Sequence, residues 1–231
     1  MVAQALEQLR AALPSGVQLV AVSKFHPVER LLEAYNAGQR IFAESRPQEL
    51  AAKVPLMPAD VQWHFIGHLQ TNKLKLVLPH VSLVQSVDSL HLLEAINAWG
   101  AANNKVIDIL LELHLGAEET KQGFTEEEIL SFLASYEGIP SETLRFASSL
   151  PHTLSNVRLR GLMGMATNTE DMEVVEKDFE RIEALYNRIK TLGIPGFDIL
   201  SIGMSQDWPV AVKHGATMVR IGTDIFGARE Y

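Results

Sequence analysis

Short apolar runs alternate with segments of helical periodicity along most of the chain. Strands buried on both faces of a parallel sheet form short apolar runs, whereas amphipathic helices repeat their apolar positions every 3.6 residues. On this basis the sequence predicts eight strands, at Leu19–Ser23, Arg40–Ala43, Gln62–Gly67, Leu83–Ser86, Val106–His114, Val157–Met165, Asp198–Met204 and Thr217–Gly222. Helical segments lie between them, and this alternation is typical of an α/β protein with a parallel sheet.

The clearest helical segment begins after Asn168 and ends at Gly193. Its apolar positions form one stripe, made of Met172, Val175, Phe179, Ile182, Leu185, Ile189 and Leu192. A glycine just after the last apolar position is a common helix terminator. Six further helices are predicted between strands, at Pro27–Ala37, Arg46–Lys53, Thr71–Leu78, Ser89–Ala101, Thr125–Tyr136 and Gln206–His214. An additional helix, from Ala3 to Leu13, precedes the first strand.

The number and order of these elements favour one fold class. Eight β–α units in sequence predict a closed parallel barrel of the (β/α)₈ TIM type, with the extra helix at its N-terminus. The alternative is a doubly wound open sheet, which usually has fewer strands and binds its ligand where the strand order reverses. No linker or internal repeat interrupts the chain, so we expect residues 1–231 to form a single domain.

Two glycine-containing turns follow the last two predicted strands. The first reads Gly-Met-Ser at residues 203–205, and the second reads Arg-Ile-Gly-Thr at residues 220–223. Glycine lets the backbone approach a ligand closely, and N–H groups at a helix start can donate to phosphate. TIM barrels commonly bind phosphate in the loops after strands seven and eight, where these turns fall. The pattern therefore predicts a phosphate-binding cup.

Lys24, at the end of the first predicted strand, allows two interpretations. By itself, a lysine in this position is most often a side chain that has just reached solvent. A lysine partly removed from water has a lowered pKa, and its neutral amine can attack an aldehyde. Together with the phosphate cup, Lys24 suggests pyridoxal phosphate held as a Schiff base.

Arg220, on the last predicted strand, is open to two interpretations as well. It is either an ion-pair partner in the barrel wall or a donor to the pyridine nitrogen of pyridoxal phosphate. An arginine in the second role would keep that nitrogen unprotonated, because two positive centres in hydrogen-bond contact repel each other. The ring would then be a poor electron sink.

Composition narrows the class of protein. The chain is 47% apolar and 21% charged, with a formal net charge of −8. Because no basic stretch is dense enough to neutralise several phosphates, we do not expect binding to nucleic acid. There is no cysteine, no leader with a basic and then an apolar region, and no apolar run long enough to span a membrane. We therefore expect a soluble, cytoplasmic protein.

Three further polar residues bear on possible sites. His64 and His68 have the i, i+4 spacing of a metal pair on a helix. The strand-like sequence between them ends in Gly67 and argues against one continuous helix, so we predict no metal site. Asp224 lies beside the predicted cup and would repel a phosphate, so we expect its side chain to face away and to cap the short terminal turn.

Several motifs, spread in order over the chain, resemble one known family. They read A-V-S-K at 21–24, A-Y-N-A-G at 34–38, H-F-I-G-H-L-Q-T-N-K at 64–73, V-D-S at 87–89, K-Q-G-F at 121–124, G-L-M-G-M at 161–165, L-S-I-G-M-S at 200–205 and V-R-I-G-T-D-I-F-G-A-R at 219–229. The blocks at 64–73 and 219–229 are highly specific. The chain thereby resembles the YggS/PROSC family, the pyridoxal phosphate homeostasis proteins.

The resemblance implies a barrel like the N-terminal domain of bacterial alanine racemase, the type III fold of pyridoxal phosphate proteins. It implies that the cofactor is attached to Lys24. It also implies phosphate contacts from Ser205, Gly222 and Thr223, and a contact between Arg220 and the ring nitrogen.

Two more cofactor contacts are expected, from Met163 and Ser45. Met163 lies near the end of the sixth predicted strand, and Ser45 follows the second. The family usually reads F-G-E-N where this chain reads F-A-E-S at 42–45. Ser45 can still donate a hydrogen bond, but its side chain is shorter than asparagine and has no amide. Ala43, in place of glycine, removes a conformational freedom of this turn.

Three functions are compatible with these residues. The first is a monomeric protein that buffers pyridoxal phosphate or delivers it to apoenzymes, without robust turnover. This hypothesis rests on a residue that we expect to be missing. Racemases of this type take a second acid/base from a separate β domain, and we expect no such domain here because the chain ends at Tyr231. The second is a small racemase-like enzyme that uses His64 or Tyr35 as its second base. The third is a cofactor-free Schiff-base aldolase acting on a sugar phosphate.

Overall fold

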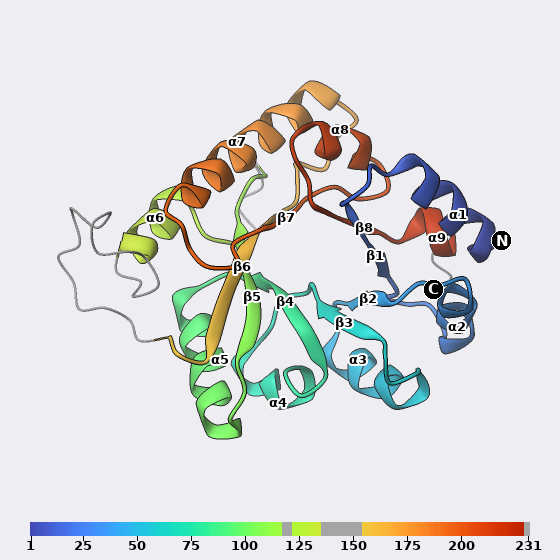
Figure 1. Cartoon of the computed structure of the whole chain (residues 1–231), viewed down its shortest axis with the longest axis horizontal. Helices are drawn as coiled ribbons and strands as arrows, with labels where there is room; N and C mark the ends of the chain where they lie inside the picture. Colours follow the sequence, from blue (N-terminus) through green and yellow to red (C-terminus); the bar gives the residue numbers. More distant parts are fainter. Residues whose placement is uncertain (117–121, 135–153, 229–231) are drawn as a thin grey trace.

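The computed structural model of the protein describes residues 1–116, 122–134 and 154–228, and its strands form a closed barrel (Figure 1). The strands are β1 Gln18–Val22, β2 Ile41–Glu44, β3 Gln62–Phe65, β4 Val81–Val87, β5 Ile107–Leu113, β6 Val157–Gly164, β7 Ile199–Ser201 and β8 Met218–Ile221. Neighbours in sequence pair in parallel, and β8 pairs with β1 to close the ring, with Val20 opposite Arg220. The predicted (β/α)₈ barrel is confirmed.

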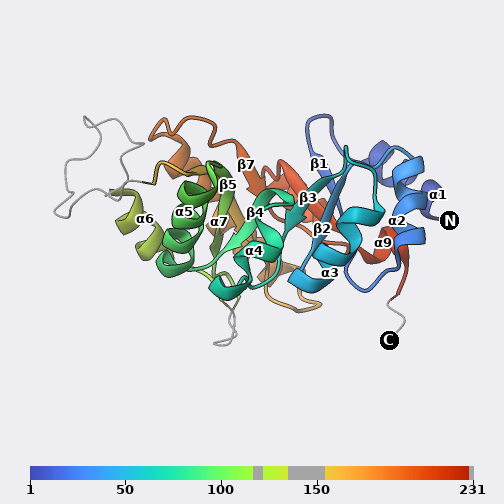
Figure 2. The same ribbon diagram turned by 90° about the horizontal axis from the view of Figure 1, so that it is seen from below.

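Helices surround the barrel (Figures 1 and 2). They are α1 Val2–Ala12, α2 Val28–Asn36, α3 Pro47–Lys53, α4 Leu74–Val77, α5 Leu90–Asn103, α6 Glu126–Ala134, α7 Met172–Lys190, α8 Trp208–Lys213 and α9 Thr223–Phe226, with 3₁₀ turns at Val54–Leu56 and Thr71–Lys73. The extra N-terminal helix is confirmed as α1, which lies beside α9 in both views. In the described ranges, no helix combines the length and apolar character needed to cross a lipid bilayer.

Alternation along the strands creates two apolar layers. Side chains that point inward fill the barrel, and those that point outward pack beneath the helices. Val20 and Val22 belong to the interior layer, whereas Ala21 between them belongs to the outer one. Most of the predicted stripe on α7 packs into the outer layer, where Phe179 and Ile182 are fully buried. Its first member, Met172, is 41% exposed, and its last, Leu192, follows the end of the helix.

Several predicted boundaries differ from the structure. The seventh strand ends earlier than predicted, at Ser201, because the chain turns at Gly203, whose φ is 94°. The helix predicted at Thr71–Leu78 is a 3₁₀ turn followed by the single turn α4. The helix predicted at Thr125–Tyr136 is confirmed as α6, while residues 135 and 136 lie outside the described ranges.

A bulge in β6 depends on one glycine. Ile109 pairs with Leu159 and the next residue, Leu110, pairs with Gly161, so β6 carries one extra residue at this point. Gly161 has a φ of 153°, and a Cβ placed there would lie 1.7 Å from the carbonyl oxygen of Ile199 in β7. Only glycine fits without displacing the neighbouring strand.

We expect Gly161→Ala to lower the free energy of unfolding by about 3 kcal/mol, because β7 must move to make room for the methyl group. Gly193→Ala is the matched control, since Gly193 also has a positive φ, 71°, but nothing lies within 4 Å of the added Cβ. The control should cost about 1 kcal/mol. Urea denaturation of both variants measures the difference, and equal losses would contradict the account of β6.

Candidate functional site

A cavity of about 260 Å³ lies at the C-terminal ends of the barrel strands. It is lined by Val22, Lys24, Ile66, Met163, Met165, Met204, Ser205, Gln206, Arg220, Gly222 and Thr223. Every predicted site residue except Ser45 is in this set. The lining combines two cationic side chains, two hydroxyls and a glycine with an apolar wall of valine, isoleucine and methionine, so it suits a flat, anionic ligand.

The two predicted turns meet at this cavity. Gly222 precedes α9, which begins at Thr223, and the N–H of Asp224 donates to Oγ of Ser205 at 3.4 Å. Burial raises the pKa of the Asp224 carboxyl, while a hydrogen bond with Ser205 opposes the rise. The expectation that Asp224 turns away is therefore wrong in part: it does not line the cavity, but its carboxyl contacts Ser205. It does not cap α9 through its side chain either.

Arg220 is 4% exposed and is held by three hydrogen bonds. One terminal nitrogen donates to the carbonyl oxygen and to Oγ of Ser201, both at 2.7 Å, and the other donates to the carbonyl oxygen of Gly164 at 2.9 Å. Burial lowers the pKa of Arg220 to about 10, against the opposing effect of Glu112 and Asp207. Arg220 therefore stays a cation at neutral pH.

A chain of hydrogen bonds crosses the barrel interior from Arg220 to His64. Arginine can only donate, so Oγ of Ser201 accepts from it and gives its own proton to Oε1 of Gln85, at 2.7 Å. The amide nitrogen of Gln85 lies 2.9 Å from Nδ1 of His64. Nδ1 is therefore the acceptor, and the neutral imidazole carries its proton on Nε2.

The structure separates the two histidines considered as a metal pair. His64 is buried and bonded to Gln85, and burial lowers its pKa to about 3. Nδ1 of His68 lies 2.7 Å from Asp88. In the described part of the chain, no group of three His, Asp or Glu side chains could hold a metal ion.

Sequence reasoning missed three polar residues inside the barrel: Gln85, Ser201 and Glu112. Glu112 is 6% exposed, and its pKa is raised to about 7, first by burial and then by Asp88, while Arg220 opposes the rise. The sequence did contain a signal for such residues: each is a polar residue in an otherwise apolar run, two positions from a residue that points into the barrel. Glu112, for example, follows inward-facing Leu110 by two positions.

Ser45 and Ala43 occupy the segment that departs from the family pattern. Ser45 lies behind Gly67: a Cβ added to that glycine would come 2.1 Å from the Ser45 carbonyl oxygen. Its cofactor contact stays a prediction. Ala43 lies fully buried in β2 without a positive φ, so a methyl group is accommodated there.

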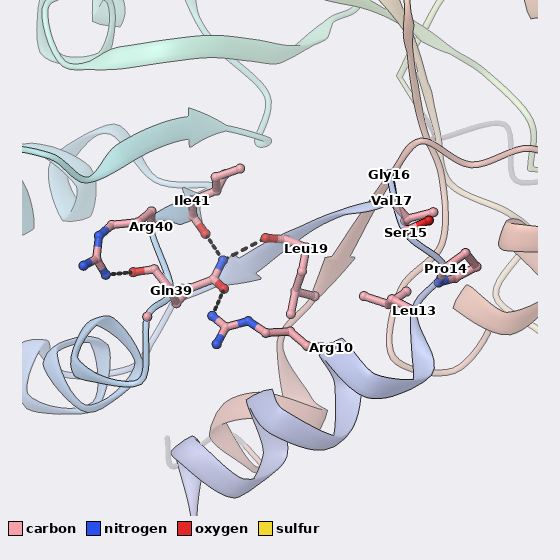
Figure 3. A pocket seen from close by; sticks show the side chains of 11 residues that line it. Arg10, Leu13, Pro14, Ser15, Gly16, Val17, Leu19, Gln39, Arg40 and Ile41 are labelled. Atoms are coloured by element: carbon pink, nitrogen blue, oxygen red, sulfur yellow. Dashed lines mark hydrogen bonds between the residues drawn. The ribbon is translucent and has the colours of Figure 1, made fainter.

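Another cavity, of about 370 Å³, lies at the opposite end of the barrel (Figure 3). The side chains of its two arginines and its glutamine already bond to the protein. Arg10 donates to the carbonyl oxygen of Ala37 and to the side chain of Gln39, and the Gln39 amide donates to the carbonyl oxygens of Leu19 and Ile41. This arrangement is structural, so the cavity lined by Lys24 and Arg220 is the candidate site.

Comparison with known proteins supports the family resemblance. Residues 2–230 match the family model described as alanine racemase, N-terminal domain. A pyridoxal phosphate homeostasis protein of Vibrio alginolyticus is 37% identical over 230 residues, which cover 97% of this chain and 92% of the relative. The chain belongs to the family of pyridoxal phosphate homeostasis proteins. A Schizosaccharomyces pombe member is 38% identical over 219 residues, covering 93% of this chain and 85% of the relative.

Solved structures of the family have the same fold. The protein resembles PipY of Synechococcus elongatus, solved without pyridoxal phosphate, with a TM-score of 0.86 and 33% identity over 98% of this chain and 100% of PipY. PipY with pyridoxal phosphate bound gives a TM-score of 0.82 at 32% identity, with the same coverage. An alanine racemase of Clostridium difficile has a TM-score of 0.77 at 13% identity, over 100% of this chain and 57% of the racemase, and shows the fold alone.

We expect His64 to destabilise the protein as the pH falls. Its pKa is about 3 when folded and 6.5 when unfolded, so between these values the unfolded chain binds more protons. The free energy of unfolding should therefore lose about 1.4 kcal/mol per pH unit from this residue as the pH falls below 6.5.

A His64→Asn variant isolates this effect. Glu112, with its raised pKa, changes stability with the opposite sign, so the His64 contribution is the difference in slope between wild type and variant. Denaturation at several pH values measures both slopes, and NMR titration follows the imidazole directly. Identical slopes, or protonation of His64 close to pH 6.5, would contradict the burial of His64 as a neutral imidazole.

Proposed function

We propose that this protein binds pyridoxal 5′-phosphate in the cavity lined by Lys24 and Arg220, and that it buffers or delivers the cofactor without robust catalytic turnover. One observation carries the proposal: a lysine, a buried arginine and a glycine- and hydroxyl-containing cup at the start of α9 converge on one cavity. The names of its relatives and the structure of PipY with pyridoxal phosphate bound support it.

The donor set fits this cofactor. The hydroxyls of Ser205 and Thr223 and the backbone at Gly222 offer donors to the phosphate, beside the apolar side chain of Met163 for the ring. When bound, pyridoxal phosphate supplies an aldehyde carbon, which a neutral lysine amine can attack with loss of water. Among the described residues that line the cavity, Lys24 is the lysine.

Two features of the cavity favour binding over catalysis. Arg220 stays cationic and would keep a pyridine nitrogen beside it unprotonated, which weakens the ring as an electron sink. Among the described lining residues, Lys24 and Arg220 are the ionisable ones, so neither a carboxylate nor a histidine stands ready as a second acid/base. Tyr35 is bonded to Asp60 at 2.6 Å, and neither it nor His64 lines the cavity.

The proposal extends to how the cofactor is used. A protein that manages cofactor supply must exchange it with the enzymes that need it, so the expected recipients are pyridoxal phosphate-dependent apoenzymes. We propose that the protein acts as a cytoplasmic monomer and that residues 1–231 work as one domain. Its net charge of −8 is unfavourable for association with nucleic acid.

We expect added pyridoxal phosphate to give the wild type a visible absorption band, and borohydride to fix the cofactor covalently to Lys24. Lys24→Ala should show neither, because the attacking amine is gone, whereas Lys75→Ala, an exposed position on α4, should match the wild type. Visible spectra and peptide mass spectrometry measure both effects. A colourless wild type that borohydride traps only with a sugar phosphate present would instead support an aldolase.

We expect the loaded protein not to exchange the Cα hydrogen of L- or D-amino acids with solvent at a useful rate, because no second acid/base is among the described residues that line the cavity. Proton NMR in deuterated water measures this exchange, with a characterised racemase of the same fold as positive control. Rapid exchange would overturn the binding-protein proposal in favour of the racemase-like alternative.

A further inference from the structure

Lys24 lies in a tight turn, residues 23–26, that has an unusual backbone. The carbonyl oxygen of Ser23 accepts from the N–H of His26 at 3.1 Å, and Phe25, the third residue of the turn, has a φ of 69°. Turns with a positive φ at this position favour glycine or asparagine. A bulky residue persists in that conformation only where its surroundings hold it.

A largely buried cluster of three charged side chains lies against this turn. Lys53 of α3 places its Nζ 2.7 Å from Oε1 of Glu44, at the end of β2, and 2.6 Å from Oε1 of Glu49, one helical turn earlier in α3. The exposed fractions of these side chains are 8% for Lys53, 0% for Glu44 and 20% for Glu49. We call these residues the carboxylate–lysine cluster.

Each member of the cluster holds the turn on one side of Lys24 or the other. Before it, Oγ of Ser23 donates to Glu44 at 2.6 Å, and the Ser23 carbonyl oxygen accepts from Nζ of Lys53 at 2.8 Å. After it, the N–H of Phe25 donates to Oε1 of Glu49 at 2.7 Å. These bonds fix the backbone on both flanks of the lysine.

The side chain of Phe25 is held as well. The guanidinium of Arg46, the residue before α3, lies 4.4 Å from the centre of the Phe25 ring. This cation–π contact comes from the same segment as Glu49 and Lys53. The strained residue is therefore tied to α3 through both its backbone and its ring.

Burial of these charged side chains is energetically unfavourable. Burial raises the pKa of Glu44, and its Oε2 is buried without a hydrogen-bond partner in the described part of the chain. Two carboxylates share one ammonium group. Apolar residues in place of a buried ion pair are often as stable or more stable, so stability alone does not account for the arrangement. Apart from the ion pairs within the cluster, the side-chain hydrogen bonds of its members to described residues run to Ser23 and Phe25 of the turn.

We propose that the carboxylate–lysine cluster is a positioning device for Lys24, which holds the strained turn so that the lysine points into the cofactor cavity. Glu44, Glu49 and Lys53 are not among the residues that line that cavity, so they act on Lys24 through the turn. The inference rests on the proposed function, because it assigns a purpose to the position of Lys24 as the attachment point of pyridoxal phosphate.

The test compares covalent attachment with non-covalent binding in Lys53→Met. Stopped-flow absorbance gives the rate of attachment of pyridoxal phosphate, and the affinity for its alcohol analogue, pyridoxine 5′-phosphate, reports binding without attachment. We expect attachment to slow by about 10²-fold, as for a misplaced reacting group, with the affinity for the analogue unchanged. Amide hydrogen exchange in the ligand-free protein should become faster at residues 24–26.

Two further variants keep the test decisive. Glu49→Gln removes the Glu49–Lys53 ion pair but leaves the Glu44–Lys53 pair and keeps an oxygen acceptor for the N–H of Phe25, so it should slow attachment less than Lys53→Met. Leu93→Ala, on the buried face of α5, is the control for loss of stability alone and should leave the attachment rate unchanged.

The outcomes separate the two proposals. A wild type that borohydride does not trap at Lys24 overturns the proposed function. If borohydride does trap the cofactor at Lys24 of the wild type, but Lys53→Met and Glu49→Gln attach the cofactor as fast as the wild type does, only the positioning role is overturned. A slowing in Leu93→Ala as large as that in Lys53→Met also overturns it, because the effect would then follow stability and not the turn.

Discussion

The pairing of β1 with β8 is the constraint on which the rest of the structure depends. These two strands come from opposite ends of the chain, and their register places Val20 opposite Arg220. Closure of the barrel therefore sets the Lys24 turn beside the Gly222–Thr223 turn, and one cavity receives groups from both. Without this pairing, the lysine and the cup would lie on separate edges of an open sheet.

A second constraint arises inside the closed barrel, where polar side chains replace part of the apolar filling. Arg220 cannot be buried without acceptors, and Ser201 and Gly164 supply them. Oγ of Ser201 in turn donates to the side-chain oxygen of Gln85, and the Gln85 amide nitrogen lies against Nδ1 of His64. The position of the guanidinium at the cavity thus depends on residues of β3, β4 and β7, which do not reach the cavity themselves.

The sequence was sufficient for the parts of the structure that local pattern determines. Apolar runs and helical periodicity predicted the barrel, and the glycine turns at 203–205 and 220–223 predicted where the cup lies. The contacts across strands could not be predicted, because they depend on register. Nothing local to Gln85 or Ser201 shows that they meet, and the bulge at Gly161 shifts that register within β6.

The same limit explains the Lys24 turn. Lys24 was recognised from its place after an apolar run, but the positive φ of Phe25 has no local signature, since the sequence there offers neither glycine nor asparagine. Its cause lies in α3 and β2, through Glu49 and Glu44. A conformation imposed by distant residues can be read only from the assembled structure.

The interior hydrogen-bond chain also restricts how this protein can change over evolution. Every hydrogen bond in the chain has a fixed direction. At one end Arg220 can only donate, and at the other end Nδ1 of the neutral His64 can only accept. A glutamate in place of Gln85 would still accept from Ser201 but would turn an oxygen toward Nδ1, so His64 would have to change tautomer as well. Substitutions at His64, Gln85 and Ser201 are therefore coupled, and an exchange that is harmful alone can become neutral beside its partner.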